Sequence, residues 1–199
     1  MMLVEVTPVA SGALPVAAFK EHLRLGSGFT DDGLQDGLLE GFLRAALATI
    51  EGRTGKALLA RTFVLTLNAW RAGDRQTLPL APVGAVTGLV LVDALGAETP
   101  VPGTVWRLYN DMHRPCLVAM TGALPTVPQH GQVRITFTAG FGPTWAGLPP
   151  DLAQAVMLLA THYYEYRSDT ALGSGCMPFG VTALMERFRS PRLTLGGGA

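Results

Sequence analysis

Apolar residues recur at steps of three and four along several stretches of the chain, which is the spacing of one face of an α-helix. The two longest stretches cover about residues 30–53 and 152–167, and each carries an apolar stripe beside polar positions. Shorter helical patterns cover about residues 15–24 and 181–189. The pattern therefore predicts about four helices, placed in the first quarter and the last quarter of the sequence.

Between these helical stretches the period of the pattern changes to two, as expected for strands with one buried face. The clearest strand covers residues 132–138, and further strands are predicted at 62–68, 83–92, 104–109 and 116–120. We therefore predict an α+β fold, a small helical bundle with an antiparallel β insert between the second and third long helices. The predicted parts are an N-terminal arm at 1–14, helical parts at 15–57 and 148–189, the β insert at 58–142, and a C-terminal tail at 190–199.

Glycines stand at four-residue steps in the second predicted helix, at Gly33, Gly37 and Gly41. Each glycine costs a helix interior about 1 kcal/mol relative to alanine, so the repetition favours a face that another backbone approaches closely. Aromatic side chains gather at the end of the helix predicted at 152–167, among them Tyr163 and Tyr166. We expect these five residues to contribute to packing between subunits.

The composition indicates that partners cover part of the protein surface. Of the 199 residues, 48% are hydrophobic and only 15% are charged, against about 25% in ordinary domains. The formal net charge is zero, which argues against broad electrostatic capture of nucleic acid. No apolar run approaches the roughly 18 residues of a membrane span, and no signal peptide is recognisable. We therefore expect a protein of the cytoplasm, or of a particle assembled there.

The sequence contains few groups that could perform catalysis. His162 and Glu165 lie one helical turn apart and could form a metal pair or a base with its orienting carboxylate, but a helix-end histidine in an aromatic cluster explains them too. Asp31, Asp32 and Asp36 fit the first turn of a helix as capping charges. Cys116 and Cys176 have no metal-binding spacing and are interpreted as idle thiols. Neither a phosphate-binding loop nor a nucleophile elbow is present, so we expect no catalytic residue, no cofactor and no metal.

Arginines gather near the C-terminus, at Arg187, Arg189 and Arg192. They could contact an acidic partner surface or DNA phosphates, or they could be solvated cations at the negative end of a helix. Both interpretations remain open from the residues alone.

A series of motifs in a fixed order resembles the head–tail connector (adaptor) proteins of long-tailed phages and of phage-like gene transfer agents. The resemblance covers about residues 15–190. The motifs are, in chain order, Thr54-Gly55-Lys56-Ala57-Leu58, Arg61-Thr62 with the strand to Trp70, Leu78-Pro79-Leu80-Ala81-Pro82-Val83 with Val86, Asp93 with Gly96, Val133-Arg134-Ile135-Thr136-Phe137-Thr138-Ala139-Gly140-Phe141-Gly142, Leu148-Pro149-Pro150-Asp151-Leu152, Tyr163-Tyr164-Glu165-Tyr166-Arg167 and Pro178-Phe179-Gly180.

The resemblance implies a structural protein of a virion neck and no enzyme. It implies a homo-oligomeric ring of twelve copies beneath the capsid portal and above the next neck protein, a stopper or a tail terminator. DNA would pass through the channel without sequence-specific binding, and the particle would be assembled in the bacterial cytoplasm. No membrane is implied. By position, the residues implied to dock on the portal are Val181, Leu184, Arg187, Phe188, Arg189, Arg192, Leu193 and Leu195.

Two features depart from the family's pattern, namely the glycine-rich second helix and the loop at 143–147. Two alternatives to the adaptor also stand at this point. One is a small metal- or ligand-binding enzyme that uses the region of His162 and Glu165. The other is a DNA-binding module that uses the terminal arginines.

Overall fold

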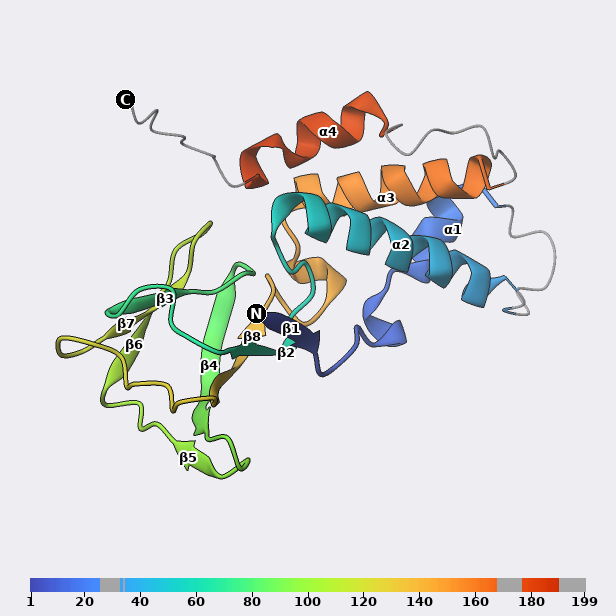
Figure 1. Cartoon of the computed structure of the whole chain (residues 1–199). Coiled ribbons are helices and arrows are strands. Elements are labelled where there is room, and N and C mark those ends of the chain that lie inside the picture. The colour runs from blue at the N-terminus through green and yellow to red at the C-terminus, as the bar shows by residue number, and fades with distance from the viewer. Residues whose placement is uncertain (26–32, 34, 168–176, 190–199) are drawn as a thin grey trace.

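The computed structural model describes residues 1–25, 33, 35–167 and 177–189. Helices gather on one side of the molecule and strands on the other (Figure 1), which confirms the predicted α+β class. Helix α3 lies between α2 and α4 and contacts both. The helical elements are α1 (Val16–His22), α2 (Asp36–Thr54), α3 (Pro150–Glu165) and α4 (Phe179–Met185), with the 3-10 turns η1 (Ser11–Ala13), η2 (Trp145–Gly147) and η3 (Glu186–Phe188).

Helix α2 owes its position to one apolar stripe and one glycine. Leu39, Leu43 and Ile50 share the buried face of the helix. Gly55 ends it with a left-handed φ of 67° and donates its N–H to the Glu51 carbonyl at 2.8 Å. The predicted stop at Gly55 is confirmed, whereas the predicted cap at residues 30–32 lies outside the described residues.

The helical core combines side chains from α1, α2, α3, α4 and η3. Pro150 occupies the first turn of α3, where its missing N–H costs no helical hydrogen bond. Burying a side chain the size of valine or methionine contributes about 1.5–3 kcal/mol to stability. The short helix α4 is therefore held in place chiefly by its buried side chains. The buried apolar residues of these five elements are Phe19, Leu39, Leu43, Ala46, Leu47, Ile50, Leu152, Ala155, Val156, Leu159, Ala160, Val181, Met185 and Phe188.

The strands form two antiparallel sheets. One has five strands in the order β1-β2-β8-β4-β5, and the other has three in the order β3-β7-β6. The strand predicted at 83–92 has the observed bounds, and the one predicted at 132–138 is one residue longer. The strands are β1 (Met2–Glu5), β2 (Arg61–Leu67), β3 (Arg75–Thr77), β4 (Val83–Val92), β5 (Glu98–Pro100), β6 (Trp106–Tyr109), β7 (Cys116–Ala119) and β8 (Gln132–Ala139).

A second hydrophobic cluster lies in the β part. Strand β8 alternates between half-buried and buried positions, and its inward side chains include Ile135 and Phe137. Phe137 stacks on Phe63 of β2 with ring centroids 5.8 Å apart. Alternation of period two therefore places every second residue of β8 in this cluster.

The N-terminal residues are integrated into the fold to a greater extent than an extended arm would be. Strand β1 pairs antiparallel with β2, from Met2 opposite Thr66 to Glu5 opposite Phe63. Farther along, Arg44 of α2 donates a hydrogen bond to the Val9 carbonyl at 2.9 Å. Pairing with a strand some 60 positions away cannot be seen in a local pattern, which explains why residues 2–5 were assigned to an arm.

One arginine joins the helical part to the five-stranded sheet. Arg61 begins β2, and its guanidinium donates to both carboxylate oxygens of Glu51 in α2, at 2.9 and 2.7 Å. Its Nε lies 3.0 Å from the carboxylate of Glu5 in β1. Glu51 also accepts the N–H of Leu58 at 2.7 Å. The elements α2, β1 and β2 thus meet at one side chain, which is only 9% exposed.

Gly140 permits the close approach of two backbones at the same junction. Its φ is +140°, and a Cβ atom built there would lie 2.4 Å from the N and Cα atoms of Ala60. The next residue, Phe141, donates its N–H to the Leu58 carbonyl at 3.0 Å. Any side chain at position 140 would therefore push apart the segment that leaves β8 and the segment that enters β2.

We expect Gly140→Ala to lower the free energy of unfolding by about 3 kcal/mol, because the added methyl group collides with backbone in a strained conformation. Gly52→Ala is the matched control, since no atom lies within 4 Å of a Cβ atom there and Gly52 is in an exposed helix turn. The control should raise stability by about 0.5–1 kcal/mol. Urea unfolding of both variants measures the contrast, and equal stabilities would refute the close-approach account.

Candidate functional site

The residues implied to dock on the portal divide into buried and exposed groups. Val181 and Phe188 are fully buried in the helical core, so they hold the last helix on the subunit and do not present a surface. Leu184 is half-buried, and Arg187 and Arg189 are exposed. Arg192, Leu193 and Leu195 lie outside the described residues.

Arg187 is tied to the start of α3. Its guanidinium lies 3.1 Å from the carboxylate of Asp151 and 4.7 Å from the centroid of the Phe188 ring. Because both charged side chains are well exposed, this pair contributes little to stability. It does orient the guanidinium on the outer surface of η3.

An exposed aromatic residue at the start of α4 was missed by sequence reasoning. Phe179 is 88% exposed, whereas Val181 and Phe188 face the core. At 100° per residue, position 179 falls on the opposite side of the helix from these two. A helical wheel of residues 179–188 could therefore have identified Phe179 as an outward anchor, and exposed aromatic residues are typical of interaction surfaces.

The glycines expected to pack against another subunit are not equivalent. Gly37 and Gly41 lie on the exposed face of α2, and among the described residues no atom beyond the helix's own nearby backbone lies within 4 Å of a Cβ atom built on either. Gly33 precedes α2 and has a φ of +69°, so it is a turn residue and the expected three-glycine ladder on the helix is wrong in this respect. Gly37 and Gly41 thus form the part of the expected ladder that lies on α2, and all three glycines are exposed.

The two tyrosines expected at a subunit interface also differ. The hydroxyl of Tyr163 lies 3.0 Å from the hydroxyl of Thr49, a hydrogen bond that links α3 to α2 inside the subunit. Tyr166 is exposed, and its ring lies 4.7 Å from the ring of His162. Tyr166 is therefore the one of the two with surface to offer a partner.

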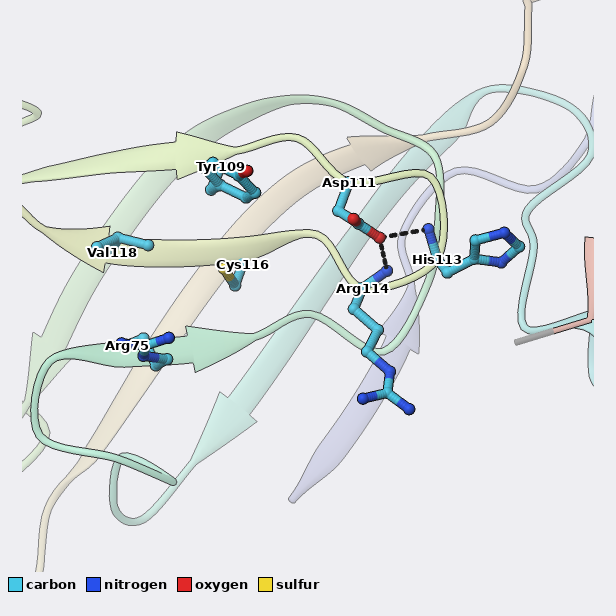
Figure 2. A pocket seen from close by; sticks show the side chains of 7 residues that line it. All are labelled: Arg75, Tyr109, Asp111, His113, Arg114, Cys116 and Val118. Carbon is cyan, nitrogen blue, oxygen red and sulfur yellow. Dashed lines mark hydrogen bonds between the residues drawn. The ribbon is translucent and has the colours of Figure 1, made fainter. Parts of the chain in front are cut away.

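A cleft of about 580 Å³ lies on the three-stranded sheet and the loop that joins β6 to β7. Figure 2 shows Arg75, Tyr109 and Cys116 on the three strands, with Asp111 at the start of the loop. The Asp111 carboxylate accepts the N–H groups of His113 and Arg114 at 2.7 and 2.6 Å. These two bonds hold the pKa of Asp111 below its ordinary value and fix the loop as a tight turn.

Lys56, in the segment that follows α2, contacts the β6–β7 loop through its side chain. The lysine is only 1% exposed, and its Nζ donates to the Met112 carbonyl and lies 3.2 Å from Nδ1 of His113. Burial lowers the pKa of Lys56, while the charge of Asp111 opposes that shift. The side chain thus links the segment after α2 to the tip of the β6–β7 loop.

The lining of the cleft combines one thiol with charged and aromatic side chains. Burial raises the pKa of the Cys116 thiol, so the thiol stays protonated near neutral pH and is a weak nucleophile. The Nδ1 atom of His113 lies 3.2 Å from Nζ of Lys56, on the side of the loop that faces this lysine. What the cleft presents is two arginines, a phenol and a carboxylate, a set suited to binding a polar or charged side chain.

The histidine–glutamate pair, which the sequence offers as a possible metal pair, lies at the end of α3. The His162 ring packs against Tyr163 and Tyr166, and Glu165 is exposed. Among the described residues, no group of three or more His, Cys, Asp or Glu side chains could hold a metal ion. Nor does any helix in the described ranges have the length and apolar character needed to cross a bilayer.

Solved structures resemble this chain along nearly its whole length. A chain in the neck of an empty gene transfer agent (GTA) particle, computed with C6 symmetry, is 59% identical, with a TM-score of 0.90. A chain in the virion of a native GTA particle is also 59% identical, with a TM-score of 0.87. A chain in the neck of a native GTA particle, computed with C12 symmetry, is 56% identical, with a TM-score of 0.85. Each comparison covers 99% of both chains. No protein-family model and no curated protein matched the chain.

We expect Asp111→Asn to lower the melting temperature at pH 7, because the neutral amide is a weaker acceptor for the two loop N–H groups. The folded-state pKa is lowered, so the carboxylate's contribution is present above its ordinary value of 3.8 and is lost as the pH falls through the folded value. The difference between the variant and the wild type should therefore shrink below pH 3.8.

Melting curves at pH 7 and at acidic pH test this prediction. Glu186→Gln is the control, because it removes one exposed carboxylate that lies outside the β6–β7 loop. This variant should keep the melting temperature of the wild type. A difference between Asp111→Asn and the wild type that stays constant across this range would contradict the assigned role of the carboxylate.

Proposed function

The chain belongs to the neck-protein family of gene transfer agent particles, and from this premise we propose that it is a head–tail adaptor. The adaptor forms a ring beneath the capsid portal and joins the head to the rest of the neck and tail. The observation that carries the proposal is the 59% identity over 99% of both chains with a protein of a GTA neck. This identity, together with a TM-score of 0.90, supports the same location for this chain in a particle of the same kind.

A ring of twelve copies is the oligomer we infer. Necks that contain related chains were computed with C6 and C12 symmetry, and twelve copies satisfy both. The sparse charge of the sequence supports the same idea, because only 15% of its residues are charged and the exposed apolar surface needs partners. Gly33, Gly37, Gly41 and Tyr166 of the expected packing set are exposed and Tyr163 is half-buried, which supports their proposed contact with a neighbouring copy.

The portal contact is assigned to the last helix and the tail. Leu184, Arg187, Arg189 and the exposed Phe179 lie on one short unit that Val181 and Phe188 hold on the core. Arg192, Leu193 and Leu195 follow directly in the chain. Arginine and aromatic side chains are enriched where protein interfaces gain their energy, which supports this placement.

The remaining neck partners follow from the adaptor role. The side away from the portal would meet a stopper, a tail terminator or another neck protein. DNA would pass through the ring without sequence-specific contacts, and the zero net charge is consistent with a channel that does not retain it. Assembly of such a particle would take place in the bacterial cytoplasm.

The finer architecture predicted from the sequence belongs to the same proposal. The adaptor subunit is a small helical bundle interrupted by a β insert between α2 and α3. The separate helical and β clusters support this division. The helical part would then carry the portal contact, while the β part extends toward other neighbours.

Deleting residues 190–199 tests the docking role. The truncated chain should keep its melting temperature, because the described core ends before this segment. Losing two leucine anchors, about 1.5–3 kcal/mol each if buried on the portal, should weaken docking by roughly a hundredfold or more. Counting tailed and tailless heads by electron microscopy, in cells that make only the truncated chain, measures the effect.

A shorter deletion of residues 197–199 is the matched control. It removes only two glycines and an alanine and keeps Arg192, Leu193 and Leu195, so particle yield should stay normal. Normal yield from the longer deletion as well would argue against docking through the tail.

A further inference from the structure

Strand β1 is an apolar strand at the edge of the five-stranded sheet. It pairs with β2 on one side, and on its other side the described part of the chain supplies no strand. Met2, Leu3, Val4 and Val6 are 59%, 37%, 43% and 52% exposed. Because successive side chains of a strand point to opposite faces, apolar groups are exposed on both faces of β1.

The phase of the hydrogen bonds shows which backbone groups are free at this edge. Val6 donates its N–H to the Thr62 carbonyl at 2.9 Å, and the register continues without interruption through Val4 opposite Val64 and Met2 opposite Thr66. In an antiparallel pair, N–H and C=O groups alternate between the partner and the outside. The N–H and C=O groups of Leu3 and Glu5 therefore point outward.

This edge lacks the features that usually keep a sheet edge from pairing. Edge strands are commonly protected by lysine, proline, a bulge or an inward charge. The sequence Met2–Glu5 contains neither lysine nor proline, and its register with β2 shows no bulge. The one charge, Glu5, is held by Arg61 at 3.0 Å instead of guarding the edge.

The opposite edge of the same sheet is protected. In strand β5, Pro100 removes one N–H group from the edge. Glu98 forms an ion pair with Arg134 at 2.7 Å. The contrast between β5 and β1 shows that the exposure of β1 is a local property and not a general character of this sheet.

We propose that the outer edge of β1 is an interface between copies, where a neighbouring copy of this chain adds an extended segment to the five-stranded sheet. The proposal rests on the proposed ring. Related chains stand in necks of C6 and C12 symmetry, so the lateral neighbours of each copy are identical copies. A cyclic ring uses heterologous contacts, in which one patch meets a different patch on the next copy. The added segment is therefore a part of the neighbour other than its own β1.

A photo-crosslinking amino acid at position 3 tests the interface in assembled particles. Replacing Leu3 with p-benzoylphenylalanine should, on irradiation, give a product of twice the 21.0 kDa subunit mass. Mass spectrometry should identify a crosslink from the amino acid at position 3 to a segment of the neighbouring copy outside residues 1–7. The same amino acid in place of Tyr109, on the other sheet, is the control and should give much less of this product. A product with a different neck protein, or no product from a ring that is present, would overturn the proposal.

Leu3→Pro provides an independent test. The Leu3 N–H points outward, so the isolated variant should keep its melting temperature, while its incorporation into necks should fall by about tenfold because the edge loses a donor. Val4→Pro removes an inward N–H instead and should destabilise the isolated subunit. Undiminished incorporation of Leu3→Pro would overturn the edge interface. If the wild-type chain itself were absent from the necks, the adaptor function would fail instead, so the two failures are distinguishable.

Discussion

The ion-pair junction of Arg61 with Glu51 and Glu5 is the interaction on which the rest of this fold depends. It lies where α2, β1 and β2 meet, between the helical cluster and the β cluster. The planar guanidinium binds both oxygens of Glu51, a geometry that lysine cannot reproduce. Removing one partner would leave charge in a site that is poorly exposed, which is costly even where the intact pair adds little net stability.

The same junction determines where the outer edge of β1 and the outer surface of α4 lie in the subunit. Gly140 lets the chain leave β8 beside the segment that enters β2, and the Phe141 ring then packs edge-on against Phe188 of η3 at 6.1 Å. The exposed edge of β1 and the outer surface of α4 are thus fixed relative to one shared junction. This connection supports the proposed adaptor, in which the edge of β1 would contact a neighbouring copy and the last helix would contact the portal.

Local signals in the sequence predicted most of the elements but few of the contacts between them. The alternation at 132–138 and the glycine after α2 were sufficient to place a strand and a helix end, because both follow from neighbours in the chain. The pairing of β1 with β2 and the reach of Lys56 to the β6–β7 loop join distant positions, and one sequence carries no local trace of them. For the site, the arginines at 187 and 189 were found on the surface, whereas Val181 and Phe188 proved buried because a short helix needs its apolar stripe for its own core.

We propose that this chain forms the ring that joins head to tail. Cryo-electron microscopy of necks, from particles made with this chain as the sole neck protein of its family, would locate it. We expect a ring of twelve copies of the fold described here, seated directly beneath the portal. Necks complete in every other part but without this chain, or with the chain located elsewhere in the particle, would contradict it.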